Sequence, residues 1–265
     1  MIRVGVIGAY GRMGREVCLA IAEDPDCVLV AAVDSNGAGE NVGSVIGHPE
    51  LVVPISDELD VLTDAEVDVA VDFTHPDAVM DNVRWCVRHA VHVVVGTTGI
   101  TPADLDEIRG LIEEEGGESN VFVAPNFAIG AVLMMWFAAA ASKFLPDAEI
   151  IELHHAAKAD APSGTALKTA EEIAKARGGG GAGSASKEVV AGARGADVAG
   201  IQIHSVRLPG LVAHQEVILG GPGQALTIRH DSYDRASFMP GVLLAVKSIA
   251  RHPGLTYGLE KLLEL

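Results

Sequence analysis

The chain has few cysteines, few basic residues and no long apolar run, and each shortage excludes a class of protein. Its three cysteines, Cys18, Cys27 and Cys86, are odd in number and lack CxxC spacing, so they imply neither a disulfide framework nor a zinc site. Against 36 Asp and Glu stand 19 Lys and Arg, a net charge of −17 that argues against nucleic-acid or anionic-membrane partners. The apolar run over residues 131–141 is too short to span a bilayer and predicts a buried helix.

What the chain has instead is length and apolar content. With 265 residues, 49% of them hydrophobic, it can bury a sizeable core as one large domain or two small ones. It begins directly with a strand pattern that leaves no room for a signal peptide, so we expect a cytoplasmic protein.

The first half of the chain alternates short apolar runs with helical periods. One expected helix carries Met13, Val17 and Ile21 on one face. Others begin at Pro76 and after Thr101, where a threonine cap, a proline at the first helical position and an acid at the third make a good start. Strands that alternate with helices imply a parallel sheet with right-handed crossovers. The expected strands cover residues 3–7, 28–33, 67–73, 92–95 and 121–124.

The pattern changes after Asn126, where strands outnumber helices. A glycine-rich turn at residues 220–223 joins two of these strands as a hairpin, and one helix is expected from Gly164. Residues 178–184 predict a flexible loop with no chemistry that we can assign. A last helix, over residues 238–250, is expected to pack back on the first domain. The expected strands cover residues 150–155, 201–208, 214–219 and 226–230.

A strand runs into a glycine-rich turn near the start of the chain. Gly8, Gly11 and Gly14 follow the spacing G-x-x-G-x-x-G, a variant of the dinucleotide-binding fingerprint. Glycine permits the tight turn and lets backbone N–H groups approach a pyrophosphate at the helix N-terminus. The turn therefore predicts NAD(P) binding, and a plain structural turn is the weaker alternative. The predicted cofactor-binding residues of this turn are Gly8, Ala9, Tyr10, Gly11, Arg12 and Met13.

These patterns predict an α/β fold with two domains. A Rossmann-type parallel-sheet domain is expected from residues 1–127 plus 238–265. A smaller α+β domain, built on a mixed sheet, is expected from residues 128–237.

Asp34 ends the second expected strand, 20 positions after Gly14. A carboxylate there accepts hydrogen bonds from the adenosine ribose hydroxyls and favours NADH. The alternative is a strand-end turn residue. Arg12 complicates the preference, because a guanidinium in the glycine turn can reach a 2′-phosphate, so the use of NADPH stays open.

Three more loops follow expected strands and should gather at the carboxyl edge of the sheet, where ligands bind in open α/β folds. Backbone and small polar groups there are candidates to fix the nicotinamide carboxamide, although turns without a ligand role are about as well supported. The candidates in these loops are Phe73, Gly96, Thr97, Thr98, Ala124, Pro125, Asn126 and Phe127.

The segment Glu152–Ala166 (ELHHAAKADAPSGTA) concentrates groups suited to acid–base chemistry on an anion. Successive side chains of a strand point to opposite faces, so His154 and His155 should not ligate one metal. One histidine can face the reacting carbon while the other contacts a different part of the ligand. Lys158 adds a fixed positive charge. The helix start at residues 163–165 (Ser-Gly-Thr) offers N–H groups and hydroxyls that can bind a carboxylate, and we call this helix start the carboxylate seat.

Such groups suit the reduction of an electron-poor C=C–C=N system. Hydride addition builds negative charge that a proton must quench, and a histidine with an ordinary pKa of about 6.5 is a suitable donor. Lys158 is a poorer acid unless it is desolvated. The structural alternative is a satisfied strand histidine beside a solvated lysine. Arg207 and Arg229 either neutralise the substrate or join subunits, and the sequence does not decide between these roles.

Taken together, these blocks resemble the 4-hydroxy-tetrahydrodipicolinate (dihydrodipicolinate) reductase family of bacterial lysine and diaminopimelate biosynthesis, over nearly the whole chain. The segment Glu152–Ala166 is similar to the signature of that family and is hard to match by chance. The other resembling blocks are residues 8–14, 72–74 (Asp-Phe-Thr), 96–99 (Gly-Thr-Thr-Gly) and 124–127 (Ala-Pro-Asn-Phe).

The resemblance implies the NADH- or NADPH-dependent reduction of a cyclic imine dicarboxylate to tetrahydrodipicolinate by a homotetramer. It implies that His154 donates the proton, that Lys158 assists, and that Asp34 holds the adenosine ribose. It also implies a substrate-carboxylate site made of His155, Ser163, Gly164 and Thr165, in a second domain that also forms the tetramer.

Two rival hypotheses remain. One is another two-domain Rossmann dehydrogenase. The other is a redox-sensing NAD(P)-binding protein, which explains the glycine turn but leaves His154, Lys158 and the helix start at 163–165 without a role.

Overall fold

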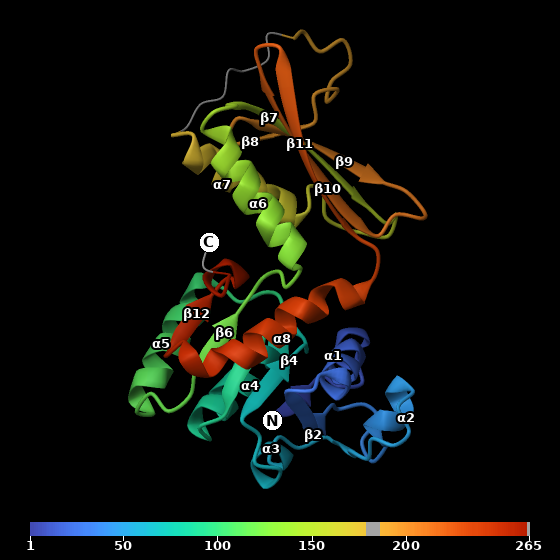
Figure 1. Cartoon of the computed structure of the whole chain (residues 1–265), viewed down its shortest axis with the longest axis vertical. Helices are drawn as coiled ribbons and strands as arrows, with labels where there is room; N and C mark the ends of the chain where they lie inside the picture. Colours follow the sequence, from blue (N-terminus) through green and yellow to red (C-terminus); the bar gives the residue numbers. More distant parts are fainter. Residues whose placement is uncertain (179–185, 264–265) are drawn as a thin grey trace. The chain divides into compact units, whose positions relative to one another are not determined.

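The computed structural model describes residues 1–178 and 186–263, which form two compact units (Figure 1). Unit 1 comprises Met1–Phe127 and Phe238–Leu265, and unit 2 comprises Ala128–Ser237. Apart from Gly178, the predicted glycine-rich loop at residues 178–184 lies outside the described residues.

Unit 1 is built on a seven-stranded parallel sheet with the order β12-β6-β5-β4-β1-β2-β3. The run β3-β2-β1-β4-β5-β6 is the doubly wound order, with its switch point between β1 and β4. The Rossmann-type prediction is therefore confirmed. The strands are β1 (Ile2–Ile7), β2 (Cys27–Val33), β3 (Ile55–Ser56), β4 (Val69–Asp72), β5 (His92–Val95), β6 (Val121–Val123) and β12 (Leu255–Tyr257).

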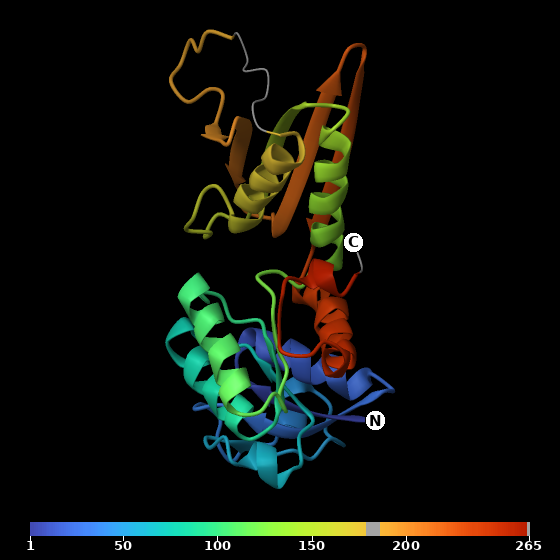
Figure 2. The same cartoon turned by 90° about the vertical axis from the view of Figure 1, so that its left-hand side faces the viewer.

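Helices flank this sheet on both faces, α4 with α5 on one and α1 with α8 on the other (Figure 2). The start of α5 is the predicted one, because the Thr101 hydroxyl accepts from the Asp104 N–H and the Asp104 carboxylate accepts from the Thr101 N–H. The central strands β4 and β5 are covered on both faces and almost wholly buried. The helices are α1 (Arg12–Glu23), α2 (Val42–Ile46), α3 (Val61–Asp64), α4 (Pro76–Arg88), α5 (Pro102–Glu114) and α8 (Met239–Ser248).

Unit 2 is built on a five-stranded sheet with the order β11-β10-β7-β9-β8, against which α6 (Ile129–Ser142) and α7 (Gly164–Ala176) pack. The sheet is mixed, as expected, because β7 and β9 are parallel whereas the other neighbouring strands of the sheet are antiparallel. The predicted hairpin joins β10 and β11 through Pro222 and Gly223. The strands are β7 (Asp147–His154), β8 (Ala196–Val198), β9 (Ile201–Arg207), β10 (Ala213–Gly221) and β11 (Gln224–Ser232).

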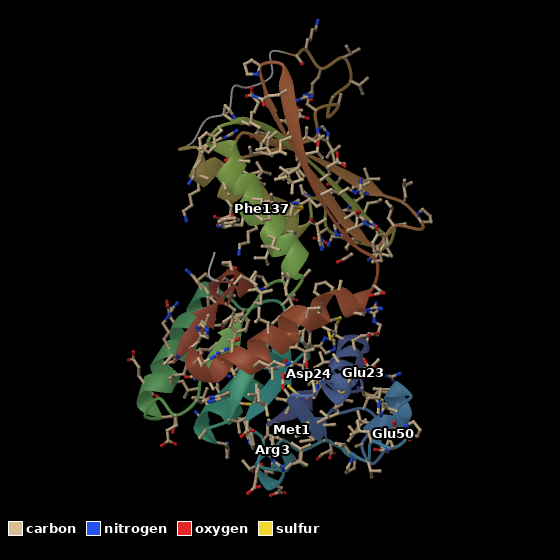
Figure 3. The ribbon with its side chains drawn as sticks, in the orientation of Figure 1. Met1, Arg3, Glu23, Asp24, Glu50 and Phe137 are labelled. Atoms are coloured by element: carbon tan, nitrogen blue, oxygen red, sulfur yellow. The ribbon has the colours of Figure 1, made fainter. Side chains whose placement is uncertain are left out.

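One expectation about unit 2 was wrong. The apolar run at residues 131–141 does form helix α6, but the helix is buried on one face only, with Trp136 and Phe137 42% and 47% exposed (Figure 3 labels Phe137). Within the chain, the helix packs on α7, β10 and β11 through one stripe, which leaves Trp136 and Phe137 on the opposite face. No helix in the described part of the chain is long and apolar enough to cross a membrane.

Candidate functional site

A cavity of about 560 Å³ opens in unit 1 where β1 to β4 end. Its volume is typical of a site for a small molecule or cofactor. The cavity lies against the switch point of the sheet, where ligands bind in doubly wound folds. It is lined by Ile7, Gly8, Tyr10, Gly11, Val33, Asp34, Ser35, Asn36, Asp57, Glu58, Leu59, Asp60, Phe73, Thr74, His75, Ala78, Asn82 and Trp85.

The glycine turn beside this cavity needs its glycines. Gly8 has a φ of +84°, and a Cβ there would lie 2.6 Å from the Phe73 carbonyl oxygen. A Cβ at Gly14 would clash with the Gly8 carbonyl, so only glycine lets α1 pack this closely on the turn. Helix α1 begins at Arg12. The N–H groups of Arg12 and Met13 belong to its first turn, and such N–H groups have no acceptors within the helix.

Asp34 stands at the end of β2 and holds the glycine turn in place. Its Oδ2 accepts from the Tyr10 N–H at 2.9 Å, and its Oδ1 accepts from the Asn36 N–H at 2.8 Å. Asp34 therefore holds the turn, as the alternative hypothesis of a strand-end turn residue expected. It also lines the cavity, and its carboxylate oxygens can accept further hydrogen bonds.

The rim of the cavity is acidic, a feature that the sequence did not reveal. Asp57, Glu58 and Asp60, from the segment after β3, join Asp34 in its lining. Among the described residues no Lys or Arg lines this cavity, and Arg12 is not part of its wall.

A second missed residue is Asp72 at the end of β4, which is completely buried. Its Oδ1 accepts from the Thr97 hydroxyl at 2.7 Å and from the Thr74 hydroxyl at 2.8 Å, and its Oδ2 accepts from the Asn82 amide at 2.7 Å. Burial raises the Asp72 pKa above its usual range, although each of these hydrogen bonds lowers it. Asp72 thus fastens the loop after β4 to the loop after β5.

Two of the three candidate nicotinamide loops contact each other through aromatic rings, and the third packs on one of these rings. The Phe73 ring lies where a side chain at Gly96 would stand, and its centroid is 5.9 Å from that of Phe127. Of the remaining candidates, Ala124, Phe127 and Thr97 are buried, Gly96 and Asn126 are partly exposed, and Thr98 and Pro125 are exposed.

In unit 2 the acid–base segment lies at the end of β7. His154 is partly buried and His155, one residue past the strand, is exposed, in line with alternating faces. The Nδ1 atom of His154 is 2.5 Å from Oε2 of Glu152, which is completely buried. Lys158 follows in a turn, and its Nζ is 2.7 Å from the Asp160 carboxylate.

Burial and neighbouring charges together shift the pKa values of His154 and Glu152. Burial lowers the His154 pKa below its usual value and outweighs the opposing effect of Glu152, while Lys158 and Arg207 lower it further. Burial alone would raise the Glu152 pKa, but hydrogen bonds led by that from Arg207 lower it below the usual range. Glu152 is therefore ionised at neutral pH.

The predicted carboxylate seat is the first turn of α7. Ser163 caps the helix, with its Oγ accepting from the Ala166 N–H at 3.2 Å. A Cβ on Gly164 would meet no atom within 4 Å, so the surface at the helix start is open. The first-turn N–H groups of a helix favour an anion.

Two family models match almost the whole of this chain. The model described as the N-terminus of dihydrodipicolinate reductase matches residues 2–127, and the C-terminal model matches residues 130–263. The chain belongs to the dihydrodipicolinate reductase family.

Individual members of the dihydrodipicolinate reductase family agree with this assignment. A 4-hydroxy-tetrahydrodipicolinate reductase from Corynebacterium diphtheriae is 49% identical, with 100% of this chain and 99% of the relative covered. One from Nocardia farcinica is 51% identical over the same shares. A dipicolinate-bound dihydrodipicolinate reductase from Paenisporosarcina sp. TG-14 superposes with a TM-score of 0.87 at 44% identity, covering 98% of this chain and 99% of that one. The resemblance drawn from the sequence is thus confirmed.

Three sets of residues were missed, although two lie within blocks that carried the family resemblance. Glu152 begins the signature segment and Asp72 begins the Asp-Phe-Thr block, but neither was assigned a role. The rim acids after β3 gave no signal, because they lie in no motif and reach the cavity only through the pairing of β3 with β2.

Proposed function

We propose that this chain reduces 4-hydroxy-tetrahydrodipicolinate, a cyclic imine dicarboxylate, to tetrahydrodipicolinate with NADH or NADPH. The observation that carries the proposal is the contact between His154 and the buried, ionised carboxylate of Glu152. This contact lies next to the open start of helix α7, in a chain that belongs to the reductase family. In this proposal unit 1 binds the dinucleotide, and unit 2 binds the substrate and joins the subunits. A cytoplasmic location is part of the proposal and is supported by the biosynthetic role of the family.

The residues of unit 1 fit a dinucleotide. The turn without side chains at Gly8 and Gly14, together with the first N–H groups of α1, suits a pyrophosphate, and Asp34 suits ribose hydroxyls. When bound, the reduced nicotinamide supplies a hydride. The residues assigned to hold the cofactor are Gly8, Ala9, Tyr10, Gly11, Arg12, Met13, Asp34, Phe73, Gly96, Thr97, Thr98, Ala124, Pro125, Asn126 and Phe127.

The residues of unit 2 bind a dianion. Ser163, Gly164 and Thr165 open α7 and take one substrate carboxylate on the first-turn N–H groups. His155, exposed beyond the strand, contacts the other carboxylate. Dipicolinate, which the Paenisporosarcina relative binds, is a dicarboxylate and supports this assignment.

His154 delivers the proton that quenches the negative charge, and Lys158 assists. In the free protein the lowered pKa of His154 favours the neutral imidazole at neutral pH. Two substrate carboxylates nearby favour the imidazolium, because an opposite charge stabilises the protonated ring. The site therefore gains its proton when the dianion binds.

The test follows absorbance at 340 nm with purified protein, NADH or NADPH, and the product of dihydrodipicolinate synthase formed in situ. The expected result is cofactor oxidation that requires the synthase, with a reaction lacking synthase as the control. If both cofactors bind and neither is oxidised, the redox-sensor hypothesis replaces this one.

The acidic rim predicts a preference for NADH. A 2′-phosphate would bring two negative charges close to Asp34 and its acidic neighbours, so we expect kcat/KM to be about tenfold or more higher for NADH. Asp34→Asn should weaken NADH binding about tenfold, through a lost charged hydrogen bond, and NADPH binding less. Fluorescence titration gives both Kd values, and Asp106→Asn, an exposed acid on α5, is the charge-matched control. Equal losses for the two cofactors would remove Asp34 from ribose recognition.

The homotetramer is proposed to form through unit 2. Phe137 and Phe144 on or just after α6 and Leu226 and Ile228 on β11 line an apolar groove on its surface, and such patches mark interaction sites. Light scattering after gel filtration should show a tetramer for the native chain and smaller species for Phe137→Glu. Val52→Glu, at an apolar site in unit 1 that is more exposed than Phe137, should leave the tetramer intact. A monomeric native chain would contradict this assignment.

A further inference from the structure

Glu152 is the centre of a buried polar network that joins His154 to the start of α7. Two nitrogens of Arg207 hold its carboxylate, Nη2 at 2.7 Å from Oε1 and Nη1 at 2.8 Å from Oε2. The Ser163 N–H donates to Oε1 at 3.2 Å, His154 contacts Oε2, and the Ser205 side chain also hydrogen-bonds the carboxylate. The network comprises Glu152, His154, Ser163, Ser205 and Arg207 and lies wholly within unit 2.

This arrangement determines which ring nitrogen of His154 carries hydrogen. An ionised carboxylate only accepts hydrogen bonds, so the ring nitrogen 2.5 Å from Oε2 must be the donor. The forked contact with Arg207 keeps Glu152 ionised. In the neutral ring Nδ1 therefore carries the hydrogen, and Nε2 remains to gain and release a proton.

We propose that Glu152 is a positioning residue that fixes His154 as the Nδ1–H tautomer, so that the proton given to the substrate leaves from Nε2. The delivery to substrate rests on the proposed function, whereas the tautomer does not. Because the same carboxylate holds the Ser163 N–H, it also ties the histidine to the start of α7. One buried group thus fixes the distance between the proton donor and the carboxylate seat.

The Glu152→Gln variant should reverse the tautomer. Apart from the histidine, Oε1 of Glu152 accepts from two N–H groups, those of Arg207 Nη2 and Ser163, whereas Oε2 accepts from one, that of Arg207 Nη1, so the amide oxygen of glutamine should take the Oε1 position. Arg207 Nη1 keeps the Val206 carbonyl as an acceptor when the amide NH₂ replaces Oε2. The amide NH₂ then occupies the Oε2 position and points a hydrogen at Nδ1 of His154. A ring that accepts at Nδ1 carries its hydrogen on Nε2.

The decisive measurement is the ¹⁵N spectrum of the imidazole rings in uniformly labelled full-length protein, above the pKa of His154. His154 is identified by the signals lost in His154→Gln. We expect a protonated Nδ1 in the native chain and a protonated Nε2 in Glu152→Gln. Glu149→Gln is the matched control, because Glu149 also lies on β7 and bonds a histidine, His204, and an arginine. That variant should leave the His154 signals unchanged.

A second readout is the pH profile of kcat/KM. A general acid must be protonated, so activity falls as pH rises through the pKa of His154. Three charged groups face the ring, namely Glu152, Arg207 and Lys158, and only Glu152 favours the imidazolium. Its loss should move the alkaline limb down by about one pH unit or more. Glu152→Asp, which keeps the charge, should keep the limb near its native position.

The outcomes separate this proposal from the proposed function. A native His154 with hydrogen on Nε2, or a Glu152→Gln spectrum and pH limb both unchanged, would overturn the role of Glu152. The native spectrum alone decides the tautomer if the glutamine variant does not fold. A native Nδ1–H tautomer in a protein that never oxidises NADH would instead reject the reductase function and leave the tautomer assignment standing.

Discussion

Replacing His154 with glutamine should lower turnover about 10²–10⁴-fold, the usual cost of a lost general acid. Glutamine still offers Glu152 a hydrogen-bond donor at a similar distance, so the network and the fold should survive. The Kd for NADH should be unchanged, and the Kd for dipicolinate should change only a few-fold. Steady-state assays at 340 nm and fluorescence titration measure these quantities.

His204→Gln is the control for that experiment. His204 also bonds a glutamate of β7, but it lies outside the site, and its replacement should leave turnover near the native rate. A His154→Gln variant that turns over at the native rate would end the assignment of His154 as the acid. A fall in turnover matched by the control would indicate damage to the sheet.

The second large effect is on stability. Removing Arg207, as in Arg207→Met, leaves the carboxylate of Glu152 buried without a cation and should destabilise unit 2 by about 3–5 kcal/mol. Urea unfolding followed by circular dichroism measures this loss. Arg229→Met removes an arginine from an exposed pair on the same sheet and should cost less than about 1 kcal/mol.

In Arg207→Met, the contribution of Glu152 to the pH dependence of stability should also change sign. In the native chain the Glu152 pKa lies below its unfolded value, so its stabilisation is present above about pH 4.3 and is lost as pH falls through the folded pKa. Without Arg207, burial raises the Glu152 pKa above the unfolded value, and stability then falls as pH rises between the two. Arg207→Met should therefore be relatively more stable at pH 5 than at pH 7.5. Adding Glu152→Gln should recover most of the loss, and no recovery would show that Arg207 acts through packing.

Local signals in the sequence predicted most of unit 1 because their causes lie within a few residues. The capping box at Thr101 and Asp104 spans one turn, and the glycine turn at Gly8–Gly14 one strand–helix connection. Strand β12 was missed because its three residues pair with β6, more than 130 residues earlier in the chain. No local pattern announces a strand whose only support is such a distant partner.

The same difference between local and distant causes applies to the residues of the candidate site. His154, Lys158 and the helix start at Ser163 are close in sequence, so the sequence alone could group them in one candidate site. Arg207 reaches Glu152 across 55 positions, through the pairing of β7 with β9, and from the sequence its role stayed open between substrate and subunit contact. Thr97 reaches Asp72 across 25 positions in the same way. Side-chain partners on neighbouring strands depend on register, which a single sequence does not specify.

The insertion of unit 2 between two parts of unit 1 has a consequence for synthesis on the ribosome. Residues 1–127 emerge long before α8 and β12, which complete the same sheet and its helical cover. Until then, the surface that buries Val242, Ala245 and Val246 has no partner, and the edge of β6 is unpaired. Unit 1 therefore completes its sheet and helical cover only after residues 239–257 have followed the whole of unit 2 out of the exit tunnel. A nascent chain stalled before Phe238 should be caught by chaperones through that uncovered face.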